Sequence, residues 1–131
     1  MAINVNIDNQ LALKYSFMIG GKKRELTFDD QCALDMDKVQ FKVQKISDKV
    51  NRMQENVVNK KSTDEQVKMM SGLYKEIRNA IIPFFDKYFG DGQGTEIYEY
   101  FNKSTRALAT VFGKVNECLD KVEINTNTKK K

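Results

Sequence analysis

The spacing of apolar residues changes once along the chain, near residue 29. Before that point apolar side chains alternate at Val5 and Ile7, and again at every second position from 11 to 19. Gly20-Gly21 interrupts the alternation, which resumes at Leu26 and Phe28. A period of two is typical of strands, so we predict a β-hairpin over about 13–28, with strands near 13–19 and 24–28. Because a lone hairpin is barely stable, it must pack on helices or pair with another chain's strand edge.

From residue 29 onward the apolar positions follow a helical period. The first stripe is Cys32, Met36, Val39, Val43, Ile46, Val50, Met53 and Val57, and the second is Val67, Met70, Tyr74, Ile77, Ile81, Phe84 and Tyr88. Within each stripe the spacing alternates between three and four residues. A short polar loop joins them, so they predict a long antiparallel helix pair. Each stripe can pack within the fold or form a coiled coil with another chain.

Several residues mark where helices begin and end. Asp29 or Thr27 can cap the first helix, and Ser62 with Glu65 forms a capping box before the second. Pro83 predicts a kink or a restart of the second helix.

The rest of the chain predicts two shorter helices. Gly90 has the place of a left-handed residue that stops a helix, Thr95 can cap a short helix over 96–101, and Ser104 can cap the last helix. The apolar pattern ends after Val122. We therefore expect a mainly α fold: an N-terminal β-hairpin, a long antiparallel helix pair and two shorter C-terminal helices, as a single domain over 1–122. Residues 123–131 are expected to form a disordered basic tail.

Composition suggests a thin core. The 131 residues are 40% hydrophobic and 31% charged, so the chain is expected to complete its core against another copy or a partner. The net charge is +4, and Lys129–Lys131 contribute most of it, so a nucleic-acid partner is not expected. The basic turn at 22–24 is interpreted as solvated. No apolar run is long enough to cross a membrane, and no secretion signal is evident.

The sequence predicts no catalytic, cofactor-binding or metal site. It contains no histidine, which excludes a Ser-His-Asp triad and a Cys₂His₂ zinc site. Cys32 and Cys118 lie on apolar stripes and are expected to be buried thiols. The segment 90–95 lacks the lysine of a phosphate loop and the third glycine of a dinucleotide fingerprint.

Four carboxylates gather near the glycine-rich segment: Asp86, Asp91, Glu96 and Glu99. Paired carboxylates can serve as an acid–base site. The alternative that we favour places Asp86 and Glu99 in solvent and Glu96 in the first turn of a helix, where its charge suits the helix dipole. We therefore expect a protein that is not an enzyme.

The segment 84–101, FFDKYFGDGQGTEIYEYF, holds seven of the thirteen aromatic residues. Aromatic side chains bury the most area per residue, so this segment organises the core, a partner surface or both. The residues that we select as candidates for partner binding are Phe84, Phe85, Tyr88, Phe89, Tyr98 and Phe101. The sequence does not separate those in the core from those that contact a partner.

Most of residues 15–122 resembles the tail assembly chaperones of long-tailed phages and prophages of Gram-positive bacteria. The matching segments are 85–90 (FDKYFG), Gly94-Thr95, Ile97, 98–101 (YEYF), 19–22 (IGGK) and 26–28 (LTF). The resemblance implies a non-enzymatic, mostly helical protein of the host bacterial cytoplasm, absent from the mature virion. It would coat the tape measure protein and keep it soluble until the tail tube polymerises around it.

The same resemblance implies self-association into a homo-oligomer and a longer form of the chain made by ribosomal frameshifting. Lys129–Lys131 are encoded by A-rich codons and suit a slippery site. Two other classes stay open: a secreted or structural helical-hairpin protein that self-assembles, and a small basic nucleic-acid-binding protein. The second would show a strongly salt-dependent affinity.

Overall fold

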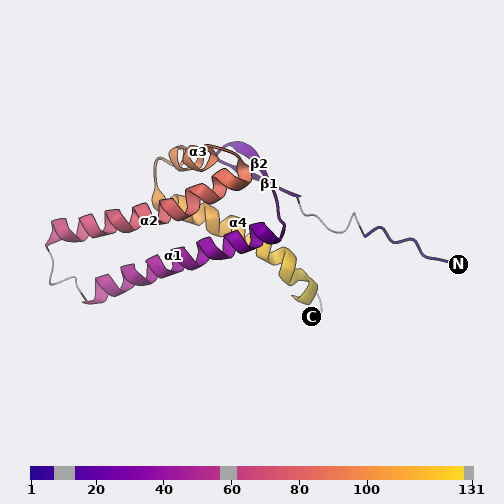
Figure 1. Cartoon of the computed structure of the whole chain (residues 1–131), viewed down its shortest axis with the longest axis horizontal. Helices are drawn as coiled ribbons and strands as arrows, with labels where there is room; N and C mark the ends of the chain where they lie inside the picture. The colour runs from indigo at the N-terminus through magenta and orange to yellow at the C-terminus, as the bar shows by residue number, and fades with distance from the viewer. Residues whose placement is uncertain (8–13, 57–61, 129–131) are drawn as a thin grey trace.

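A computed structural model of the chain describes residues 1–7, 14–56 and 62–128, although the side chains of 53–56 and 120–128 lie outside that description. The predicted fold class is confirmed. The elements are β1 (Lys14–Ile19), β2 (Lys22–Thr27), α1 (Asp30–Asn56), α2 (Thr63–Phe89), α3 (Gln93–Tyr100) and α4 (Thr105–Thr128). The helices α1 and α2 lie side by side as a long pair, α4 crosses that pair, and α3 and the hairpin cover one end of α2 (Figure 1).

The hairpin forms because its two-residue turn suits the twist of its strands. Ile19 pairs with Lys22, and the intervening Gly20 and Gly21 both have positive φ, 64° and 74°. A tight hairpin turn of this kind requires positive φ at both positions, which glycine adopts without strain. The strand β2 therefore begins at Lys22, two residues earlier than predicted. Tyr15, Phe17 and Ile19 face the core, and the alternate β1 residues are exposed.

The predicted caps of the long helices are present. The Asp29 carboxylate accepts the Cys32 amide at 2.9 Å, and Ser62 and Glu65 form the reciprocal capping box. Of the two outcomes expected at Pro83, a kink or a restart, the restart is excluded, because α2 continues through it to Phe89. A proline inside a helix costs roughly 3 kcal/mol. Burial of the flanking Ile81 and Phe84 offsets that cost.

The core lies where the four helices and the hairpin meet. Phe84 and Phe85 each pack against Phe112 of α4, with ring centroids 5.5 Å and 6.3 Å apart. The other fully buried side chains of this cluster include Cys32, Met36, Ile81, Ile97, Leu108 and Leu119. The aromatic segment is therefore chiefly the centre of the fold.

The corner between α2 and α3 differs from its prediction in two ways. Gly90 has φ 122° and ψ 156°, a region open to glycine alone, whereas the left-handed residue is Gly92. The helix α3 begins at Gln93 and has no cap from Thr95. Instead Asp86, on α2, accepts the Gly94 amide at 2.7 Å. Asp86 is half-buried for this reason, which corrects its expected position in solvent.

The last helix is longer than the sequence predicted. The expected disordered tail began at residue 123, but α4 continues to Thr128. Helix propagation adds one backbone hydrogen bond per residue, and Asn and Thr lower helix propensity without ending a helix as proline does. Lys129–Lys131 lie outside the described residues.

Substituting Gly94 with alanine is expected to lower the free energy of unfolding by about 1–3 kcal/mol, because the added methyl overpacks a tight contact. A Cβ at Gly94 would lie 2.5 Å from the Ile82 carbonyl oxygen, whereas a Cβ at Gly72 would meet nothing within 4 Å. The matched Gly72→Ala is expected to be stabilising by up to about 1 kcal/mol. Urea unfolding of both variants measures the difference, and a neutral Gly94→Ala would contradict the packing of α3 on α2.

Candidate functional site: an uncovered apolar groove

The candidate partner-binding residues separate into two groups by burial. Phe84 and Phe85 are inside the core, with 4% and 0% of their surface exposed. Tyr88, Phe89, Tyr98 and Phe101 are half-buried and pack against the core from its edge. A partner role for these four stays a prediction, whereas Phe84 and Phe85 offer almost no surface to a partner.

The half-buried aromatics already have contacts within the chain. The Tyr88 hydroxyl donates to Asp35 at 2.5 Å, and Phe89 meets Phe17 edge-on at 6.4 Å between ring centroids. The Arg78 guanidinium lies over the Tyr98 ring, 5.5 Å from its centroid. These contacts give the aromatic segment a structural role that does not require a partner.

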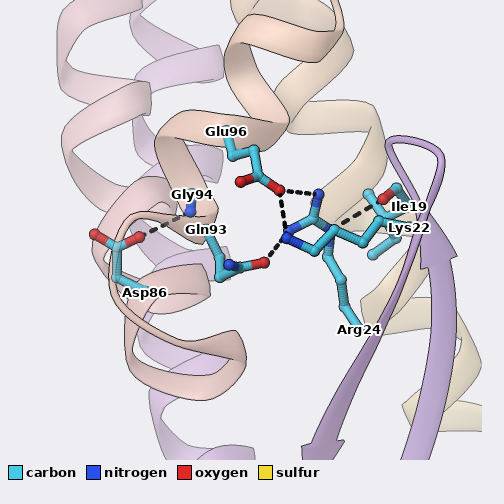
Figure 2. Close-up of polar contacts among 7 residues, drawn as sticks. All are labelled: Ile19, Lys22, Arg24, Asp86, Gln93, Gly94 and Glu96. Atoms are coloured by element: carbon cyan, nitrogen blue, oxygen red, sulfur yellow. Dashed lines mark hydrogen bonds and ion pairs between the residues drawn. The ribbon is translucent and has the colours of Figure 1, made fainter.

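A buried arginine fastens the hairpin to α3 (Figure 2). Arg24 is 3% exposed, which overturns its expected solvation, whereas the other two basic residues of the turn, Lys22 and Lys23, are exposed as expected. Its Nε donates to the Ile19 carbonyl at 2.9 Å, one terminal nitrogen donates to Glu96 at 2.9 Å, and the other donates to the Gln93 side chain. A buried charge is tolerated only when paired and hydrogen-bonded, and every Arg24 nitrogen has an acceptor.

Glu96 receives a second cation from the same strand. The Lys22 ammonium lies 3.0 Å from the Glu96 carboxylate, at the exposed side of the network. Hydrogen bonds from Lys22 and from Arg24 lower the pKa of Glu96 below its usual range. The carboxylate therefore stays ionised as a structural partner, and the interpretation of Glu96 as an acid–base group loses support.

A second polar cluster joins α1 to α2. Asp35 accepts from Lys87 at 2.7 Å and from Tyr88 at 2.5 Å. Hydrogen bonds from Lys87, Tyr88 and Gln31 lower the pKa of Asp35 to about 2. Desolvation and the hydrogen bond to Asp35 raise the pKa of Tyr88 well above its usual range.

The two cysteines differ in environment. Cys32 is buried, and burial, with the nearby Asp29, raises the pKa of its thiol to about 11. This thiol is therefore an inert part of the core at neutral pH. Cys118 is exposed, which corrects the expectation that both thiols are buried.

The apolar stripes of α1 and α2 are covered along only part of their length. Near the core Met36, Val39 and Ile81 are buried, and Ile46, farther along the α1 stripe, is buried as well. Farther along the pair Val50 and Met70 are half-buried, and Val67 is 63% exposed. This gradient arises because α4 crosses the pair and leaves its loop end uncovered (Figure 1).

The uncovered stripes border a groove between α1, α2 and the start of α4. Its apolar lining residues are Val43, Val50, Met70, Tyr74, Ile77 and Ala109. The first turns of α4 close one end, where Arg106 donates to the Tyr74 hydroxyl at 2.8 Å and Arg78 donates to Thr105 at 3.0 Å. The groove is thus an apolar channel with a polar rim, an arrangement that accepts the apolar face of a helix.

The opposite face of the helix pair has a different character. A hollow there is lined by Lys42, Lys45, Lys49 and Glu76, with Ile46 and Ala80 at its floor. Lys49 and Glu76 lie 3.9 Å apart across it, with both side chains about half exposed. The cationic lining makes this face a poor match for an apolar helix, so we take the groove as the candidate site.

Comparison of the chain with protein-family models, curated proteins and solved structures finds no match. Over the described ranges no group of three or more His, Cys, Asp and Glu side chains is placed to hold a metal ion. A search of the same residues finds no helix with the length and apolar content to cross a membrane.

Arg24, which is buried, and Lys22, which is exposed, both contact Glu96, so their substitutions can be compared directly. Arg24→Met is expected to lower the free energy of unfolding by about 2–3 kcal/mol. Hydrogen bonds to charged groups are worth about 1.5–3 kcal/mol each, and the apolar replacement offsets part of their loss because no charge has to be desolvated. Lys22→Met removes an exposed ion pair and is expected to cost less than about 1 kcal/mol. Denaturant unfolding of the two variants checks this order, and equal losses would show that Arg24 does not fasten the hairpin.

The Asp35 cluster predicts a pH dependence of stability. Because the folded pKa of Asp35 is lowered to about 2, its contribution is complete above the unfolded value of 3.8 and is lost as pH falls toward 2. We expect Asp35→Asn to be less stable than the wild type at pH 6, with the difference shrinking below pH ~4. Urea titrations between pH 2 and 6 measure it. Asp37→Asn, at an exposed position of α1, is the control and should show no such convergence.

Proposed function

We propose that the protein is a non-enzymatic chaperone that binds an apolar helix of its client in the groove between α1, α2 and α4. Following the resemblance described above, the client is the tape measure protein of a long-tailed phage. The chaperone keeps this client soluble during tail assembly in the host cytoplasm. The observation that carries the proposal is the loss of burial at the loop end of two regular apolar stripes, at Val50 on α1 and at Met70 and Val67 on α2.

The geometry of the helix pair supports a helical occupant. Near the core, Leu108, Phe112 and Val115 of α4 belong to the same buried cluster as residues of α1 and α2. Beyond the first turn of α4 the stripes continue, with Val50 and Met70 lining the groove. A client helix placed there would complete the three-helix packing that α4 begins, and would present apolar residues at a three- and four-residue spacing.

The length of the groove bears on stoichiometry. It extends from Val43 to Val50 on α1 and from Met70 to Ile77 on α2, roughly 10 Å at 1.5 Å per residue. One copy therefore covers about two turns of a client helix. A long client needs many copies in a row, which agrees with the proposed homo-oligomer that coats the tape measure protein and is absent from the mature virion.

The proposal includes a longer form of the chain made by frameshifting near Lys129–Lys131. Reading the codons tests this part by itself. A lysine run broken by guanines, with no overlapping downstream frame, would remove its support.

The groove is tested by co-expression with the long reading frame encoded downstream, followed by pull-down and sizing. The wild type is expected to bring a long, otherwise insoluble helical protein into solution with many copies bound. Met70→Lys is expected to weaken client binding at least about tenfold, equivalent to ~1.4 kcal/mol, because an ammonium in the groove is desolvated.

Met69→Lys is the matched control, because Met69 is also half-buried on α2 but does not line the groove. Circular dichroism and thermal melting of both variants establish that they fold. Equal loss in the two variants would place the client elsewhere. A folded wild type that leaves the client insoluble and unbound would overturn the chaperone proposal.

A further inference from the structure

No strand among residues 1–7, 14–56 and 62–128 covers the outer edge of β1. Among the described residues β1 pairs with β2 alone. Ile19 and Lys22 close a two-residue turn and form a hydrogen-bonded pair. Hydrogen-bonded and non-hydrogen-bonded pairs alternate along an antiparallel ladder. Lys14, Ser16 and Met18 belong to the non-hydrogen-bonded pairs, so they direct their amide and carbonyl groups away from β2. These side chains are exposed. The edge is therefore a template for one more strand.

An apolar hollow lies beside this edge. It is lined by Phe17 and Ile19 of β1, by Phe101, and by Val111, Val115 and Cys118 of α4. Met18, whose side chain is exposed, lies at its border. Phe17 and Ile19 face the core, so the hollow extends the core-facing side of the hairpin beyond β1. A third strand on this edge would place every second side chain over the hollow.

The first residues of the chain have the matching pattern. Ile3, Val5 and Ile7 are 89%, 61% and 54% exposed, and polar Asn4 lies between the first two. In Figure 1 this arm, residues 1–7, extends away from the rest of its own molecule. A row of exposed β-branched residues at a period of two is typical of a strand whose apolar face needs a cover.

We propose that the arm of one copy adds to the β1 edge of a second copy, with Ile3, Val5 and Ile7 over the hollow beside Phe17 and Val111. Two observations choose a second copy as the occupant. The arm has the alternation that the edge and the hollow require, and it extends away from its own hairpin (Figure 1).

This contact joins two different surfaces, an arm and an edge, so each copy in a linked pair still has one arm or one edge that the contact does not use. Heterologous contacts of this kind generate rings or open helical arrays, rather than closed pairs. The inference concerns how copies of the chain join and does not depend on the identity of any client.

Cys118 provides a test, because it is exposed and lines the hollow, whereas Cys32 is buried. One copy is an untagged Cys118→Ser chain with a single cysteine introduced by Ile3→Cys, Val5→Cys or Ile7→Cys. The other is the wild type with a size tag. The two are mixed and oxidised mildly, and non-reducing gels measure the disulfide-linked product of mixed mass.

We expect at least one of the three arm positions to give tenfold more mixed product than the Asn4→Cys control, whose side chain would point away from the hollow. No mixed product, or an equal yield from the control, overturns the proposal. So does a chain with both Val5→Cys and Cys118 that forms only an intramolecular disulfide, because its arm then covers its own hairpin. No client is present, so the result leaves the groove to be judged by its own test.

Discussion

The structure depends on how the hairpin and α3 are held on the aromatic end of α2. Gly94 lies directly against the backbone of Ile82, and its amide is capped by Asp86 from the preceding helix. That contact fixes α3, and α3 in turn supplies Gln93 and Glu96 to the buried guanidinium of Arg24. A buried guanidinium without these acceptors would be strongly unfavourable. The hairpin therefore packs in a defined position only when the turn between α2 and α3 is formed.

The contacts that stabilise the fold are consequently concentrated at one end of the long helix pair. The covered end has the aromatic core, the Arg24 network and the Asp35 cluster, whereas the loop end has stripes of half-buried and exposed residues. Few buried apolar contacts imply a low local free energy of opening. An end that is anchored by a rigid core and opens locally can adjust to the side chains of different helical segments, which the proposed binding of a long client would require.

The sequence predicted the features set by short-range patterns and missed those set by contacts between distant residues. The stripes, the Gly20-Gly21 turn and the Ser62–Glu65 box depend on near neighbours, and all are present. Arg24 was assigned to solvent because its two side-chain acceptors, Gln93 and Glu96, are more than 65 residues away. The period of two could have predicted the burial of Arg24, since Arg24 lies on the same strand face as the buried Leu26. Asp86 had no such signal. The groove could not be predicted, because it arises from the crossing of α4.

The helix α4 connects the two proposed binding surfaces. Ala109 faces the groove, whereas Val111 and Val115 face the hollow beside β1. These residues lie on different sides of one helix whose Leu108 and Phe112 are fixed in the core. A client helix and the arm of a neighbouring copy would therefore bind at the same time without competing for side chains. The client helix and the arm would both contact α4. Binding at either surface would reduce the conformational freedom of α4 and so lower the entropic cost of binding at the other. Assembly along a client would then be cooperative even if no residue contacted both partners.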